Sequence, residues 1–185
     1  MAEMTTNRIP LTAPPTQAAL ADRAPVVREG VTLEALPEGT ILHLLARPTQ
    51  VAAPFADKVA AAGLDLRVVA PGQWFATAPT VMSGADLVVL SQALKPEVDV
   101  VDQSHGRVGI VLHGPLAARV LAKGTAVDLD PSAFPVGRSA TTLVGHIAAH
   151  LTRVNAERFE IVVQRGFAGS LFDDLSQMSL EFARL

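Results

Sequence analysis

The sequence predicts an α+β protein made of two ferredoxin-like subdomains, each with helices on one face of an antiparallel sheet. Two observations support this prediction. Short apolar runs typical of strands alternate with segments of helical spacing, in the order strand, helix, two strands, helix, two strands, helix, two strands, helix. Of the 185 residues, 49% are hydrophobic and 18% are charged, which suits a packed core and excludes generic disorder. We place the subdomains at about 31–96 and 97–185.

Start and stop signals define the elements of the first half. Residues 1–30 predict an irregular tail, because several prolines interrupt it and no sustained period runs through it. Gly63 supplies a left-handed helix stop, Pro71-Gly72 predicts a turn, and Ser83 can cap a second helix. We expect strands over 40–46, 64–70 and 74–78, and helices over 51–62 and 83–94.

The second half repeats this rhythm without visible identity to the first. Pro115 stands where a first helical residue belongs, and Gly124 lies just past the end of that short helix. Apolar residues spaced three and four apart predict an amphipathic helix near the C-terminus. We expect strands over 98–102, 108–113, 142–153 and 159–164, with a hairpin turn at 155–158, and helices over 115–123 and 168–182.

Composition excludes several classes of protein. The net charge is −3 and no three basic residues fall together, so a nucleic-acid-binding protein is not expected. The chain has no cysteine, which excludes disulfides, thiolate catalysis and cysteine-bound metals. No apolar run approaches the ~20 residues that span a bilayer, and the N-terminus lacks a signal-peptide pattern. We expect a soluble, cytoplasmic protein.

The histidines do not predict a metal site. His146 and His150 are four apart, but the surrounding alternation favours a strand, on which they lie roughly 13 Å apart at ~3.3 Å per residue. His43 lies in an otherwise apolar strand and is interpreted as a half-buried structural residue. No metal ligand is therefore predicted.

No stretch of the chain predicts a catalytic centre. Asp102, Ser104 and His105 lie within four positions, whereas a hydrolytic triad converges from separate segments. The glycine patterns of dinucleotide and phosphate loops are absent. We expect no catalytic residue and no cofactor on this chain, and the sequence defines no cofactor-binding residue.

Three residues keep two interpretations each. Arg138 and Arg165 follow or precede glycines in loops, where a guanidinium either binds an anion or anchors the loop by an ordinary ion pair. Trp74 is the one tryptophan in a chain without tyrosine, so it is either a core residue or an interface anchor.

A run of motifs in the second half resembles the gamma subunits of heterotetrameric sarcosine oxidases. The resemblance covers about 31–182, and its specific part is the C-terminal half. Thr125 and Ser139 stand where that family often has cysteine. The matching segments are Asp102-Gln103-Ser104, His113-Gly114-Pro115, 118–124, 127–131, Phe134 to Arg138 with Gly137, 140–142, Phe159-Glu160 and Arg165-Gly166-Phe167-Ala168, with Pro71 to Trp74 a displaced match upstream.

The resemblance implies a fold similar to the folate-binding domain of the glycine-cleavage T-protein. It also implies partners, the alpha, beta and delta subunits of one complex, and a gamma chain that braces the assembly without performing a chemical step. In that family beta oxidises the N-methyl amino acid with FAD, and FMN at the alpha–beta boundary passes electrons to oxygen. Alpha also carries NAD and a tetrahydrofolate site, and delta holds zinc.

The residues offered as interface or motif positions are Trp74, Asp102, Ser104, Phe134, Gly137, Arg138, Arg165 and Phe167. Two alternatives stay open at this point, besides an unrelated α+β domain that only shares the scaffold. One is a gamma-type subunit of a complex that acts on another N-methyl amino acid, such as N-methylglutamate. The other is a free-standing folate-binding module.

Overall fold

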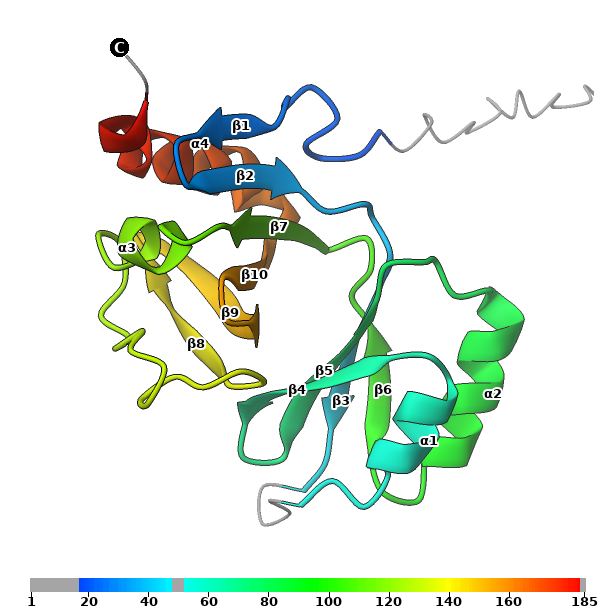
Figure 1. Ribbon diagram of the computed structural model, residues 1–185. Helices are drawn as coiled ribbons and strands as arrows, with labels where there is room; N and C mark the ends of the chain where they lie inside the picture. The colour runs from blue at the N-terminus through cyan, green and yellow to red at the C-terminus, as the bar shows by residue number, and fades with distance from the viewer. Residues whose placement is uncertain (1–16, 48–51, 184–185) are drawn as a thin grey trace, which may run out of the picture.

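The strands of the chain gather into two antiparallel sheets (Figure 1). The computed structural model describes residues 17–47 and 52–183. The first strands and helices are β1 (Val26–Arg28), β2 (Val31–Ala35), β3 (Thr40–Leu45), α1 (Ala56–Ala61), β4 (Asp65–Ala70), β5 (Gln73–Ala78) and α2 (Gly84–Leu94). The remaining ones are β6 (Asp99–Asp102), β7 (Arg107–His113), α3 (Ala117–Leu121), β8 (Ser139–Val144), β9 (Ile147–Asn155), β10 (Arg158–Gln164) and α4 (Ala168–Met178), with 3-10 turns at Arg165–Phe167 and Leu180–Phe182.

Each sheet carries helices on one face, as the predicted α+β class requires. The four-stranded sheet has the order β4-β5-β3-β6 and is built from the continuous segment 40–102. This interleaved βαββαβ arrangement is ferredoxin-like, and α1 and α2 cover its outer face (Figure 1). The six-stranded sheet has the order β1-β2-β7-β10-β9-β8 and packs against α3 and α4.

The two sheets divide the chain differently from the expected boundary near residue 96. β2 precedes the four-stranded sheet in sequence but pairs with β7 of the six-stranded sheet, while β6 still belongs to the four-stranded sheet. The expected irregular tail also contains one strand, because Val26–Arg28 forms β1 and pairs with β2. Gly30, with φ of 71°, makes the tight turn between these two strands. Residues 1–16 of that tail lie outside the described part of the chain.

The predicted strand over 142–153 is two strands. Gly145 adopts a φ of 61°, which starts a turn after β8, and its N–H donates to the carbonyl of Gly124 at 2.7 Å. His146 lies in this turn, so the expectation of one strand carrying both His146 and His150 was wrong. The apolar alternation runs through the turn without a break, and therefore only the glycine signalled it.

Three helices differ in length from their predictions. The helix expected from 51 begins at Ala56, because Pro54 lacks an N–H and disfavours helical backbone before it; residue 51 lies outside the described residues. α3 covers only Ala117–Leu121, and Pro115 precedes it. α4 ends at Met178 and a 3-10 turn follows. The cap of α2 is confirmed, since Ser83 Oγ accepts a hydrogen bond from the Asp86 N–H at 3.1 Å.

Strand alternation gives every central strand two distinct faces. In β5, Trp74 packs toward α1 and α2, whereas Phe75 points to the opposite side. In β10, Phe159, Ile161 and Val163 belong to the core under α3 and α4, and Val162 points the other way. The helix-free faces of the two sheets meet, because Ile41, Phe75 and Val162 form one small buried cluster.

We expect Phe55→Ala to lower the free energy of unfolding by about 3–5 kcal/mol, because the side chain is fully buried and its loss leaves a cavity. Phe55 meets Trp74 edge to face, with ring centroids 5.2 Å apart. Urea unfolding followed by Trp74 fluorescence measures the change. Val88→Ala on the exposed side of α2 is the control and should change stability by less than about 0.5 kcal/mol. Equal effects of the two substitutions would contradict this packing.

Candidate functional site

The contact between the two sheets contains several buried polar groups, and we call it the seam. It consists of the cluster Ile41, Phe75 and Val162 together with the charged and aromatic groups around it. Phe75 lies at its centre. The His150 ring contacts the Phe75 ring edge to face at 5.1 Å, and the Arg107 guanidinium lies 4.8 Å from the centre of the same ring. The seam therefore joins apolar contact with buried polar groups.

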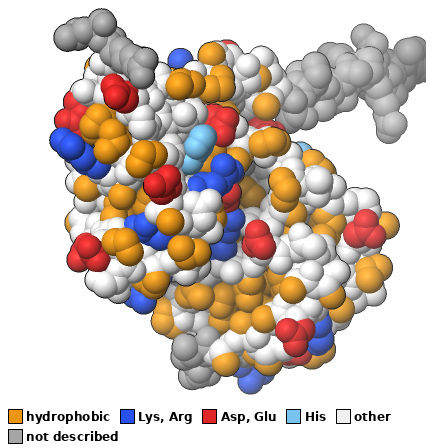
Figure 2. Space-filling view, in the orientation of Figure 1, with side chains coloured by type: hydrophobic (Ala, Val, Ile, Leu, Met, Phe, Trp, Pro, Cys, Tyr) orange, Lys and Arg blue, Asp and Glu red, His pale blue; other side chains and the backbone are white. Residues whose placement is uncertain are grey.

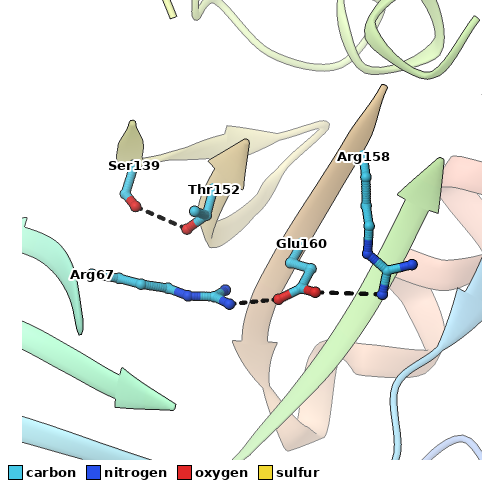
Figure 3. Close-up of polar contacts among 5 residues, drawn as sticks. All are labelled: Arg67, Ser139, Thr152, Arg158 and Glu160. Atoms are coloured by element: carbon cyan, nitrogen blue, oxygen red, sulfur yellow. Dashed lines mark hydrogen bonds and ion pairs between the residues drawn. The ribbon is translucent and has the colours of Figure 1, made fainter. Parts of the chain in front are cut away.

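An ion pair crosses the seam (Figure 3). Arg67 Nη2 of β4 lies 2.6 Å from Glu160 Oε2 of β10, and the two side chains are only 9% and 16% exposed. Arg158 Nη2 lies 3.4 Å from the other carboxylate oxygen of Glu160. Figure 3 shows the two guanidinium groups approaching Glu160 from opposite sides, with the Ser139–Thr152 hydrogen bond close by. One carboxylate thus serves two arginines.

His150 is neutral at neutral pH. Burial, together with the positive charges of Arg67 and Arg107 and the nearby His43, lowers the pKa of His150 from 6.5 to about 4. Its Nδ1 lies 3.4 Å from Thr141 Oγ1. Burial also lowers the pKa of His43, whose Nε2 lies 3.2 Å from Gln73 Oε1. Both rings act as structural groups, as the sequence interpretation of His43 has it.

A cleft of about 300 Å³ opens beside the ion pair. Its walls come from both sheets and from the link between β2 and β3. Figure 2 shows basic, acidic and hydrophobic side chains side by side in the middle of the face of the molecule that it draws. The lining residues include Leu36, Arg67, Arg107, Val108, Arg158 and Glu160.

Two of the predicted positions are core residues. Trp74 is 3% exposed and packs in the core of the four-stranded sheet, so it leaves no surface for a partner. Phe134 is 2% exposed and packs under the six-stranded sheet. Of the two interpretations of Trp74, the buried one fits the structure.

Asp102 and Ser104 organise the turn between β6 and β7. Asp102 Oδ1 accepts a hydrogen bond from the Ser104 N–H at 2.9 Å, and Ser104 Oγ accepts one from the Ile41 N–H at 3.0 Å. The hydroxyl that a triad would need is therefore used to fix this turn to β3. The carbonyl of His105 accepts from Arg165 Nε at 2.7 Å.

Arg165 connects its own loop with the loops that contain Glu38 and His105. Its Nη2 lies 2.7 Å from Glu38 Oε2, and this hydrogen bond lowers the pKa of Glu38. The anchor interpretation of Arg165 thus fits the structure. Gly137 has a φ of 85°, and its N–H donates to the Arg153 carbonyl at 2.8 Å. Arg138 is exposed and Phe167 is 52% exposed, so both remain accessible.

The described residues contain no group of three or more histidine, aspartate or glutamate side chains that could hold a metal ion. Over the same residues, no helix has the length and apolar character to cross a membrane.

Comparison with known proteins places this architecture. The family model for the GCVT N-terminal domain matches residues 65–183, which is more than half of the chain. The chain belongs to this family. The matched region runs from β4 to the C-terminal turn and includes both partners of the seam ion pair.

Individual relatives agree with the family. The chain is 34% identical over 115 residues to sarcosine oxidase subunit gamma from Corynebacterium sp. strain P-1, covering 61% of this chain and 55% of that protein. It thus spans about half the length of this curated relative. A chain of the heterotetrameric sarcosine oxidase from Corynebacterium sp. U-96, solved with pyrrole 2-carboxylate, matches with a TM-score of 0.77 and 26% identity, over 92% of this chain and 97% of that one.

A solved T-protein shares the fold alone. The glycine cleavage system aminomethyltransferase T from Bartonella henselae matches with a TM-score of 0.54 and 18% identity, over 79% of this chain and 45% of that one. The predicted resemblance to sarcosine oxidase gamma subunits and the T-protein-like fold are confirmed by these matches.

The sequence of this GCVT-family chain did not predict a role for Arg67 or Arg107, and Glu160 was noted only as part of a matching segment. Arg67 and Glu160 each interrupt a strand whose neighbours are mostly apolar, and Arg107 begins such a strand; that local contrast was the available signal. Arg153 was missed as well; it is 3% exposed, lies over the Phe159 ring at 4.5 Å and donates to the carbonyls of Ala156 and Leu129. Strand pairing, which no local pattern specifies, decides which of these charges meet.

Glu160→Gln should lower the free energy of unfolding by about 3 kcal/mol, because it leaves the buried Arg67 without a counter-charge while preserving the shape of the side chain. Chemical denaturation measures the change. Glu97→Gln is the matched control, since Glu97 pairs with Lys58 at the surface and its loss should cost less than about 1 kcal/mol. If the two variants unfolded alike, the buried pair would have no special role.

Acid should destabilise the protein through His150. The folded-state pKa of about 4 lies below the ordinary 6.5, so the unfolded chain binds more protons between these values. The contribution of His150 to stability is therefore nearly complete above about pH 7 and falls by about 2.5 kcal/mol between about pH 7 and about pH 4.5. Denaturation at both pH values, compared with His150→Gln, isolates this contribution. A variant with the same pH dependence as the wild type would contradict it.

Proposed function

We propose that the chain is a non-catalytic, structural gamma-type subunit of a heterotetrameric sarcosine-oxidase-type complex. One observation carries this proposal. The match to a chain of the heterotetrameric sarcosine oxidase runs over 92% of this chain and 97% of that one, at 26% identity. A match of nearly full length on both sides supports an equivalent place in an equivalent assembly.

The contacts of the candidate residues support a bracing role. Polar contacts within the chain involve Asp102, Ser104 and Arg165. Arg138 and Phe167 are the exposed members of the predicted set and are proposed to face neighbouring subunits. Such a chain contributes packing surface, and the chemical steps belong to other subunits.

The proposed partners are the alpha, beta and delta subunits, in the cytoplasm. These subunits would hold FAD, FMN, NAD, tetrahydrofolate and zinc, and this chain would hold none of them. The complex would demethylate sarcosine oxidatively to glycine and pass the one-carbon unit to tetrahydrofolate on another subunit.

Two alternatives concern the substrate and the assembly. A related complex acting on another N-methyl amino acid, such as N-methylglutamate, would use a similar gamma-type chain. A free-standing folate-binding module is favoured only by the T-protein match, which at 18% identity concerns the fold.

Co-expression of the tagged chain with its neighbouring genes should yield a yellow complex with three further polypeptides whose flavin absorbance bleaches on adding sarcosine. The isolated chain with added flavin should not oxidise sarcosine. Size-exclusion chromatography with an absorbance scan measures both properties.

Two other outcomes of this experiment would favour the alternatives. A yellow complex that bleaches only with a different N-methyl amino acid would change the substrate and keep the assembly. A colourless chain that purifies alone and binds tetrahydrofolate would support the free-standing module and contradict the subunit proposal.

A further inference from the structure

The cleft beside the seam presents a guanidinium that the chain itself leaves without a counter-ion. Glu160 already serves Arg67 and Arg158, at 2.6 Å and 3.4 Å. Arg107 lines the same cleft and makes no ion pair with any residue in the described ranges 17–47 and 52–183. Its charge is therefore available for a carboxylate from outside the chain.

The position of Arg107 is fixed before any ligand arrives. Its guanidinium lies over the Phe75 ring at 4.8 Å, and burial lowers the pKa of this group. An arginine side chain in a protein nevertheless keeps its charge. Its Nε is buried and, among the described residues, finds no hydrogen-bond acceptor. A buried donor without an acceptor is costly, and a charged acceptor is its strongest remedy.

The other carboxylates of the cleft are not placed to serve Arg107. Glu38 lies 2.7 Å from Arg165 and also accepts a hydrogen bond from the Ala19 N–H at 2.9 Å. Asp65 lines the cleft and is exposed to solvent, and it forms no ion pair with Arg107. With Arg165 counted, four guanidinium groups stand against three carboxylates around this cleft.

The walls of the cleft define what accompanies the carboxylate. Leu36, Val108 and Val162 supply apolar surface beside the arginines. The volume of about 300 Å³ is at the lower limit of small-molecule pockets, which span about 300–1,000 Å³. A cleft of this size suits one acidic side chain and an apolar neighbour.

We infer that the cleft receives an acidic segment of a partner subunit, an aspartate or glutamate next to apolar residues, with its carboxylate on Arg107. This inference rests on the proposed function, because a subunit without a substrate of its own uses such a charge for assembly. Complementary charge at an interface selects the partner and fixes its orientation. The seam then holds the two sheets of the chain together and also holds the partner to both of them.

The test uses the tagged full chain, co-expressed with the other subunits of its complex. Arg107→Gln should weaken association by about thirtyfold or more, because the partner carboxylate would be buried without its cation. Arg119→Gln is the matched control, since this arginine lies on α3 outside the cleft with a side chain 67% exposed. Arg107→Lys keeps the charge, and its affinity for the partner should lie between those of the wild type and Arg107→Gln. The amount of partner subunit that co-purifies with the tagged chain, measured at increasing salt concentrations, gives the effect.

A second measurement does not depend on a variant folding. Phenylglyoxal should modify Arg107 in the isolated wild-type chain and leave it unmodified in the complex, as read by peptide mass spectrometry. Thermal unfolding of isolated Arg107→Gln separates lost stability from lost association.

The outcomes distinguish this inference from the proposed function. If wild type and Arg119→Gln capture no partner subunit, the proposed function fails. If both capture the partners and Arg107→Gln does so equally, with Arg107 still modified in the complex, only the acidic-segment inference is overturned. Protection of Arg107 by benzoate in the isolated chain, without protection in the complex, would overturn it in favour of a free carboxylic acid.

Discussion

A single carboxylate between two sheets is the contact on which this architecture depends. Each sheet has its own helices and its own hydrophobic core, and a small apolar cluster lies between the two sheets. Glu160 supplies the directional part of that junction, because it pairs with Arg67 from the opposite sheet and with Arg158 from its own strand. Buried ion pairs add little net stability but penalise every arrangement that separates the partners. The ion pair therefore specifies how the two layers align.

Alternation along the strands made this arrangement possible. In β10 the apolar residues Phe159, Ile161 and Val163 face the helices, which leaves Glu160 and Val162 on the side of the other sheet. In β9, His150 occupies the same side and stays neutral because burial and two arginines oppose its protonation. The seam is thus formed by every second residue of several strands, on the faces that carry no helices. None of these residues marks the seam by itself in the sequence, because the seam forms only when the strands come together.

Much of the fold could be predicted from the sequence because its signals are local. The Ser83 cap, the Pro71-Gly72 turn and the period of the last helix depend on neighbouring residues only, and the structure contains all three elements. Pro54 and Gly145 were equally local signals, but the apolar pattern around them concealed their effect on α1 and on the β8–β9 turn. The seam could not be predicted. Arg67 and Glu160 are 93 residues apart, and their meeting depends on how two complete sheets pack.

The path of the chain through the six-stranded sheet has a consequence for its synthesis. β2 emerges before the whole four-stranded sheet, yet its pairing partner β7 comes only after that sheet is complete. The segment 40–102 closes with its own contacts and can fold on the ribosome as soon as it is free. β1 and β2 must wait with unpaired edges until β7 appears, and the sheet is complete only with β8, β9 and β10. Such long-range pairing is slow, so the N-terminal hairpin is the part of the nascent chain that most needs protection from aggregation.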